Sequence, residues 1–154
     1  MPERSWTDTD LAYFAGILDG EGCFALRRRR GSKFDCNVLV ANTDLRLISW
    51  LQTHFGGRID FESRTPPQKN LWHWTTSSHS LTELLEAVLP FLVIKRDRAE
   101  LMLAYRATLA PRAQKTRHSA GVAWSSRPTT DAVKQERANI HAQLSVLNKR
   151  GVAS

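Results

Sequence analysis

The chain has 154 residues, 42% of them hydrophobic and 24% charged, and a formal net charge of +7. This composition excludes a disordered basic tail, and the length predicts one compact domain. No apolar run reaches the ~18 residues of a membrane span, and the 2 cysteines and 5 histidines lack the spacing of a disulfide framework or a zinc site, which indicates an intracellular protein with no membrane partner.

In chain order, the hydrophobic pattern predicts a helix, a hairpin, a second helix, a second hairpin and further helices. The first helix ends at Gly20 and Gly22, and Gly31-Ser32 forms the turn of the first hairpin. The second helix follows a cap at Asn42-Thr43-Asp44, and Pro66-Pro67 separates the strands of the second hairpin. The predicted helices cover 7–20, 45–55, 80–92, 95–109 and 129–149, and the predicted strands cover 23–30, 34–41, 58–64 and 70–76.

Hairpins mixed with helices predict an α+β fold, with helices packed on one face of an antiparallel sheet. Alternation places Phe24 on the covered face of the first hairpin, with Val38 and Val40 from the next strand. Trp72 and Trp74 lie two residues apart, and we expect both to pack in the core beneath the sheet because large aromatic residues dominate such cores.

The uncovered face of this sheet is predicted to carry polar side chains. A twisted β-ribbon fits the major groove of DNA, where such side chains read base edges. The acids on this face have two interpretations that the sequence leaves open, namely acceptance of hydrogen bonds from cytosine or pairing with cross-strand arginines. The predicted DNA-binding residues of the sheet are Arg27, Arg29, Lys33, Asp35, Asn37, Arg58, Asp60, Glu62, Arg64 and His73.

Positive charge is concentrated in two stretches without acids, Arg27–Arg30 extended by Lys33, and the segment 110–128. Such runs are often only solvated surface, but in a chain that is basic overall they favour contacts with phosphate groups. The partner is therefore predicted to be a polyanion. In the second stretch the candidates for phosphate binding are Lys115 and Arg117.

The most specific motif is the segment 14–22, which reads FAGILDGEG. Ala12, Gly16 and Gly20 recur every four residues, and this stripe of small residues would allow a second helix to approach closely. Glu21 follows at the C-terminal end of the helix, where the helix dipole disfavours an anion, so a divalent cation is its natural partner. Taken alone, Glu21 would be no more than an acid in an exposed turn.

This segment resembles the signature of the LAGLIDADG homing endonuclease family, with Phe for the first Leu, Gly for the last Ala and Glu for the last Asp. The resemblance extends over about 8–109 and implies an αββαββα fold with a four-stranded saddle-shaped sheet, followed by a C-terminal helical region at 129–149, all within one domain spanning 1–154. Because the chain holds one copy of the motif, the resemblance implies a homodimer acting on a near-palindromic DNA site. The implied interface residues are Ala12, Ala15, Gly16, Asp19 and Gly20.

The resemblance also implies the activity, the cofactor and the catalytic residues. It implies a site-specific endonuclease that cleaves double-stranded DNA with Mg²⁺, with Mn²⁺ as a substitute and Ca²⁺ supporting binding without cleavage. Glu21 would be a metal ligand together with Gly20, and Asn42 and Arg46 would position water. Lys95, in the segment LPFLVIK, would offset the charge that develops on the phosphate.

The alternative is a non-cleaving nucleic-acid binder on the same fold, either an intron maturase that binds intron RNA or a repressor-like reader of DNA. A basic RNA-binding α+β domain would also explain the charge, but it has no use for the stripe of small residues. The expected location is the cytoplasm of a bacterial or phage-infected cell, or an organelle.

Overall fold

The computed structural model describes residues 6–109 and 129–149. It confirms the α+β fold, with a four-stranded sheet in the order β1-β2-β4-β3 and antiparallel pairing throughout. The elements are α1 (Asp8–Glu21), β1 (Gly22–Arg28), β2 (Phe34–Asn42), α2 (Leu45–Phe55), β3 (Arg58–Glu62), β4 (Leu71–Thr75), α3 (Leu81–Val88), the 3₁₀ helix η1 (Leu89–Phe91), α4 (Arg96–Ala107) and α5 (Asp131–Asn148).

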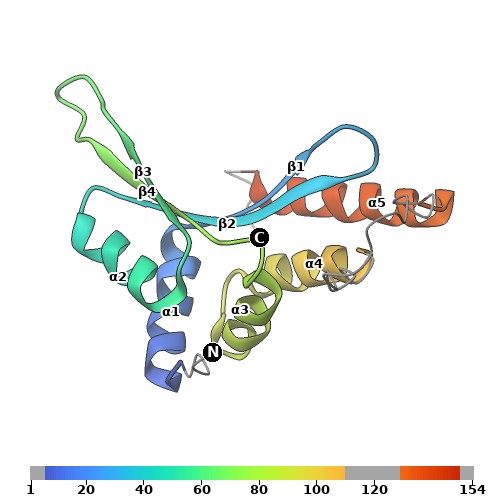
Figure 1. The fold of residues 1–154 in the computed structure, drawn as a ribbon, viewed down its shortest axis with the longest axis horizontal. Coiled ribbons are helices and arrows are strands. Elements are labelled where there is room, and N and C mark those ends of the chain that lie inside the picture. Colours follow the sequence, from blue (N-terminus) through green and yellow to red (C-terminus); the bar gives the residue numbers. More distant parts are fainter. Residues whose placement is uncertain (1–5, 110–128, 150–154) are drawn as a thin grey trace, which may run out of the picture.

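The helices α1 to α4 lie on one side of the sheet (Figure 1), and α5 contacts α4 and β1. The β1–β2 hairpin and the β3–β4 hairpin rise on either side of the point where α1 meets the sheet, so the face away from the helices is concave. This arrangement leaves one broad face of the sheet free of helices. None of the helices in the described part of the chain is both long and apolar enough to span a membrane.

The core lies between the sheet and the helices, as the alternation of apolar residues predicts. Phe24 is fully buried on β1, and Val38 and Val40 are buried on β2, while the residues between them point to the other face. The helix expected over 80–92 ends earlier, because Pro90 has no amide hydrogen to donate and converts the last turn to η1.

The two tryptophans of β4 both pack on the core side of the sheet, as predicted, but they are buried to different extents. Trp74 is 0% exposed and its Nε1 donates a hydrogen bond to the Gly56 carbonyl at 2.7 Å. Trp72 is only partly buried, and its ring lies 4.6 Å from the ring of the half-exposed Phe61. Both rings lie on the helix-covered face, where Trp74 is fully buried in the core and Trp72 packs against the core while partly exposed.

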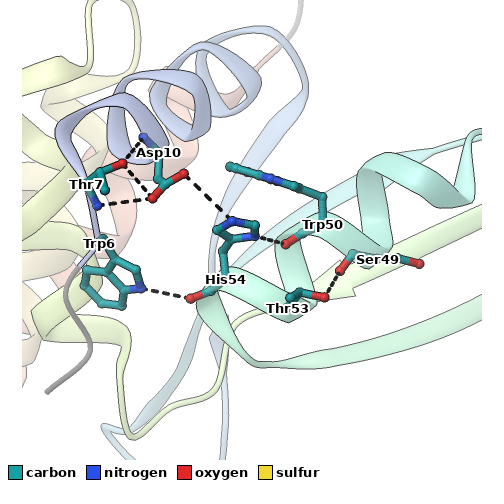
Figure 2. A network of polar contacts seen from close by, with 7 residues as sticks. All are labelled: Trp6, Thr7, Asp10, Ser49, Trp50, Thr53 and His54. Atoms are coloured by element: carbon teal, nitrogen blue, oxygen red, sulfur yellow. Dashed lines mark hydrogen bonds and ion pairs between the residues drawn. The ribbon is translucent and has the colours of Figure 1, made fainter. Parts of the chain in front are cut away.

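A polar network ties the start of α1 to the end of α2 (Figure 2). Thr7 and Asp10 form a capping box at the start of α1, and hydrogen bonds from Thr7 lower the pKa of Asp10. Trp6 Nε1 donates to the His54 carbonyl at 2.9 Å, and His54 Nε2 lies 3.8 Å from Asp10 Oδ1. These contacts fix the N-terminal end of α1, and therefore the direction in which its C-terminal end points.

A buried tyrosine holds the first residue of β2. Tyr105 is 1% exposed, and its hydroxyl accepts a hydrogen bond from Phe34 N at 2.8 Å and donates one to Phe34 O at 2.9 Å. Replacing Tyr105 with Phe should lower the free energy of unfolding by about 1–3 kcal/mol, because two buried backbone groups lose their partner. Thermal unfolding measures this loss, and Tyr13→Phe on the exposed side of α1 should leave the melting temperature unchanged. Equal melting temperatures for Tyr105→Phe and the wild type would contradict this role.

Candidate active site and nucleic-acid interface

The predicted catalytic acid lies where α1 passes into the sheet. Glu21 is the last residue of α1, and Asn42 is the last residue of β2. The pairing of Gly22 with Val40 brings these two chain segments to the same end of the β1–β2 ladder. As a result, Asn42 Nδ2 donates a hydrogen bond to Glu21 Oε2 at 2.8 Å, which joins two residues that the sequence separates by 21 positions.

Asn42 connects Glu21 to the start of α2. Its Oδ1 accepts a hydrogen bond from Asp44 N at 2.7 Å, and Asp44 is the N-cap of α2. Arg46 Nη2 lies 2.6 Å from Asp44 Oδ2, and this contact lowers the pKa of Asp44 to about 2. The side chain of Arg46 is 91% exposed. Arg46 therefore binds Asp44 directly, and it is linked to Glu21 only through Asp44 and Asn42.

Asp44 is a site residue that the sequence interpretation treated only as a helix cap. The signal for its second role is the spacing of Asp44 and Arg46, which allows the capping carboxylate to hold the guanidinium two residues later. Both residues line an open hollow of about 530 Å³ beside Asn42, and the remaining lining residues are Tyr13, Leu47 and Trp50.

Lys95 also lies against the C-terminal end of α1. Its Nζ donates to the carbonyl of Leu18 at 2.9 Å and to the carbonyl of Gly22 at 2.7 Å. A cation at this position adds a donor at the C-terminal end of α1, where the helix dipole favours positive charge. Burial is the main reason that the pKa of Lys95 is lowered, and the charge of Arg98 adds to this. The side chain is thus held against α1, which excludes a freely solvated lysine.

Asp19, one of the implied interface residues, is half-buried and binds a segment of its own chain. Its carboxylate accepts hydrogen bonds from the backbone amides of Val93 at 2.9 Å, Ile94 at 3.1 Å and Lys95 at 2.9 Å. Both carboxylate oxygens are engaged within the chain. The reason is that a residue near the end of a helix also faces whatever segment passes that end.

The outward face of α1 matches the stripe of small residues, with one correction. Ala12, Gly16 and Gly20 are exposed, and a Cβ added at Gly16 or Gly20 would meet no atom within 4 Å. Ala15 is 1% exposed and packs into the core of its own chain, so it does not belong to this face. Large apolar side chains are exposed nearby, on α1 itself and on the segment that Asp19 binds: Tyr13 (54% exposed), Val93 (84%) and Ile94 (66%).

The groups near Glu21 would supply only part of the ligands of a divalent ion. Within 6–109 and 129–149, no three His, Cys, Asp or Glu side chains are grouped to hold a metal ion. Mg²⁺ is usually held by one or two carboxylates together with water and substrate phosphates, and not by a complete cage of protein ligands. The exposed carboxylate of Glu21 and the backbone carbonyl of Gly20 fit that requirement, provided that DNA and a second copy of the chain supply the other ligands.

The concave face of the sheet carries most of the predicted DNA-binding residues. Arg27 pairs in register with Asp35, and Asp60 pairs with His73, so these four share this face with Asn37, Arg58 and Glu62. β1 ends at Arg28, so Arg29 and Lys33 lie in the turn of the first hairpin, and Arg64 lies beyond the end of β3. Lys115 and Arg117 lie outside the described residues.

The acids of this face pair with basic neighbours, but only Asp35 pairs with an arginine across a hairpin, as the second interpretation predicts. Asp60 Oδ2 lies 2.8 Å from Arg58 Nε, and Glu62 Oε1 lies 2.8 Å from Arg64 Nε. These arginines are on the same chain segment as the acids, not on the opposite strand. Pairs that cross between chain segments are Glu62 with His73 at 2.6 Å and Asp35 with Arg29 at 2.7 Å. Hydrogen bonds from Arg64 and His73 lower the pKa of Glu62.

Comparison with known proteins places the fold. No family model and no curated protein sequence matches the chain. Among solved structures, the homing endonuclease I-CvuI in complex with the I-CreI target is 19% identical, with a TM-score of 0.64 over 95% of this chain and 86% of that one. The archaeal intron-encoded homing endonuclease I-Vdi141I, complexed with DNA, is 14% identical, with a TM-score of 0.68 over 96% and 89%.

A third similar structure is larger than this chain. The LAGLIDADG homing endonuclease I-SmaMI bound to cleaved DNA is 16% identical, with a TM-score of 0.54, and the match covers 94% of this chain but 45% of that one. The present chain thus spans about half the length of I-SmaMI. The strand order, the helices on one face and these similarities agree with the resemblance carried by the segment 14–22. The chain therefore has the fold of the LAGLIDADG homing endonucleases.

Proposed function

We propose that this protein is a site-specific endonuclease that cleaves double-stranded DNA with a divalent metal ion. The observation that carries the proposal is the carboxylate of Glu21 at the end of α1, bonded to Asn42 and adjacent to the carbonyl groups that Lys95 binds. This arrangement occurs in a chain with the fold of proteins solved in complex with DNA. The concave face of the sheet, rich in arginine, would provide the DNA contacts.

Each residue of the site has a task that its position suits. Glu21 would hold Mg²⁺ together with the Gly20 carbonyl, and the ion would supply charge stabilisation and activation of water. Asn42 holds one carboxylate oxygen of Glu21 and so orients the other. Lys95 would place positive charge beside the scissile phosphate as negative charge develops on it. Arg46, kept exposed by Asp44, would contact solvent or phosphate at the rim of the site.

A homodimer would complete the site, because one chain offers a single Glu21 and cleavage of two strands needs two such acids. The exposed stripe of Ala12, Gly16 and Gly20 would let α1 pack closely against α1 of the partner. Val93 and Ile94 would be covered at the same interface, since exposed apolar side chains of this size mark contact surfaces. An isologous pair would bring two copies of Glu21 together and would match a near-palindromic DNA site.

The DNA interface gives a prediction for salt dependence. Arg27 and Lys33 form no ion pair with any residue in the described ranges, so both are free to contact phosphate. Replacing both with Ala should make the plot of log affinity against log salt shallower by about 0.9 for each phosphate that these side chains neutralise. Titrations in Ca²⁺ at several salt concentrations measure this slope, and Lys134→Ala on α5 is the matched control. An unchanged slope would mean that neither Arg27 nor Lys33 contacts a phosphate of the DNA.

The test of the proposed function is cleavage of the DNA that flanks the insertion point of the protein's own gene. The assay uses purified protein in Mg²⁺, in Mn²⁺ and in Ca²⁺. Double-strand cleavage in Mg²⁺ and Mn²⁺, with binding but no cleavage in Ca²⁺, is the expected result. Tight binding in every metal without cleavage would favour a repressor-like reader. Preference for the intron RNA over the DNA would favour a maturase. Either of these results would contradict the proposed activity.

A further inference from the structure

Two side chains exchange hydrogen bonds across the junction between α1 and the segment 92–95 that precedes α4. Asp19, on α1, accepts hydrogen bonds from three consecutive backbone amides of that segment. Lys95, at the end of the segment, donates two hydrogen bonds from its Nζ, to the carbonyl of Leu18 in α1 and to the carbonyl of Gly22 at the start of β1. The contact is therefore reciprocal, because each side of the junction supplies polar groups to the other.

Leu92, at the start of this segment, is 4% exposed and packs in the core, whereas the residues after it have little packing of their own. The segment forms bends and has no regular structure, and Val93 and Ile94 are 84% and 66% exposed, so their side chains contribute little packing within the chain. Three of its four amides bond to Asp19, and the fourth, of Leu92, bonds to the carbonyl of Leu89. Leu92 thus anchors the start of the segment in the core, and the Asp19 carboxylate binds the amides of the three residues that follow.

The position of the Lys95 ammonium depends on that backbone. A lysine side chain has many rotamers and carries about 2 kcal/mol of rotamer entropy, so its Nζ reaches two particular carbonyls only if its Cα is held in place. One of these carbonyls belongs to Gly22, which directly follows Glu21. Asp19 therefore controls where the ammonium lies relative to the end of α1 that carries the predicted catalytic acid.

We propose that Asp19 is a positioning residue, which sets the place of the Lys95 ammonium beside Glu21 without itself contacting DNA or metal. This inference rests on the proposed function, because positioning has a catalytic consequence only if Lys95 acts at a phosphate. Loss of a residue that orients an active-site group typically lowers activity by about 10- to 100-fold. Binding of DNA should be unaffected, since the sheet residues that would contact DNA are elsewhere.

The first measurement is the chemical reactivity of Lys95, which requires no activity. Reductive dimethylation of the DNA-free protein, followed by mass spectrometry, gives the labelling rate of Lys95 relative to the exposed Lys33 and Lys69. In the wild type, Lys95 should react slowly because its Nζ is bound to two carbonyls. In Asp19→Asn and in Asp19→Ala, the labelling rate of Lys95 relative to these two lysines should rise several-fold. The variant used is the one whose circular dichroism spectrum matches that of the wild type.

The second measurement is single-turnover cleavage in Mg²⁺ alongside DNA affinity in Ca²⁺. The Asp19 variants should cleave about 10- to 100-fold more slowly, with an affinity within about twofold of the wild type. Asp10→Asn is the matched control, since Asp10 caps the opposite end of α1. It should lower thermal stability but leave the labelling of Lys95 and the cleavage rate unchanged.

The outcomes separate the two proposals. Unchanged labelling of Lys95 in a folded Asp19 variant would overturn the positioning role, whatever happens to cleavage. Faster labelling with a normal cleavage rate would also overturn it, as would loss of cleavage that sedimentation traces to a changed oligomeric state. A wild type that does not cleave at all would contradict the proposed function instead, while the labelling ratio would still decide whether Asp19 holds Lys95.

Discussion

Replacing Glu21 with Gln should abolish DNA cleavage and leave DNA binding in Ca²⁺ intact. Gln has nearly the same shape, and its amide oxygen can still accept the hydrogen bond from Asn42, so the end of α1 should keep its structure. What the variant loses is the negative charge that would hold a divalent ion. Loss of metal-based stabilisation of about 4 kcal/mol corresponds to a cleavage rate at least about 1,000-fold lower.

Single-turnover cleavage and a binding titration on the same DNA measure this difference. Glu86→Gln is the matched control, because Glu86 is an exposed glutamate on α3, away from the end of α1. It should cleave at the rate of the wild type. Retained cleavage by Glu21→Gln would show that Glu21 is not a catalytic residue. If Glu21→Gln lost both DNA binding and cleavage, Glu21 would instead be a structural residue.

Replacing Gly16 with Leu should separate the proposed dimer into folded monomers. A Cβ at Gly16 meets no atom within 4 Å in the single chain, so the side chain has room there. Leu also favours the helix by up to about 1 kcal/mol relative to Gly, so the monomer should be at least as stable as before. If α1 packs against its partner at this glycine, each added Leu overpacks the contact at a cost of about 1–3 kcal/mol.

With one such residue from each chain, the dimer dissociation constant should rise at least about 30-fold, which corresponds to ~2 kcal/mol. Analytical ultracentrifugation measures this change directly. The melting temperature of the wild type should also rise with protein concentration, whereas that of Gly16→Leu should not. Ala142→Leu, at an exposed position of α5, is the control and should remain dimeric. A monomeric wild type, or a dimeric Gly16→Leu, would contradict the proposed interface.

The elements of this fold follow from local patterns, and the sequence therefore predicts them well. The capping group at Thr7, the glycines after Leu18 and the alternation from Phe24 onward are each governed by residues within a few positions of one another. Pro90 marks the break between α3 and α4 for the same reason. The motif at 14–22 likewise indicates the helix that ends at Glu21, because its glycines and acids are adjacent in the chain.

What the sequence pattern leaves undecided is how far each side chain is covered. Trp72 and Trp74 have the same periodicity and both pack against the core, yet only Trp74 is fully buried. Ala15 lies one position from the exposed Gly16 and is buried against the sheet and helices of its own chain. Periodicity assigns a residue to a face of its element, but exposure depends on the neighbours of that face.

The sequence by itself thus predicted the α+β class, the basic residues of the sheet and the acid on which the proposed chemistry depends. Only the tertiary structure decided the partners of that acid. Asn42 reaches Glu21 over 21 positions, and Asp19 reaches the amides before α4 over as many as 76, through contacts that exist only after the sheet and helices have assembled. Hydrogen bonds between distant residues require particular distances and angles, and a linear pattern contains neither.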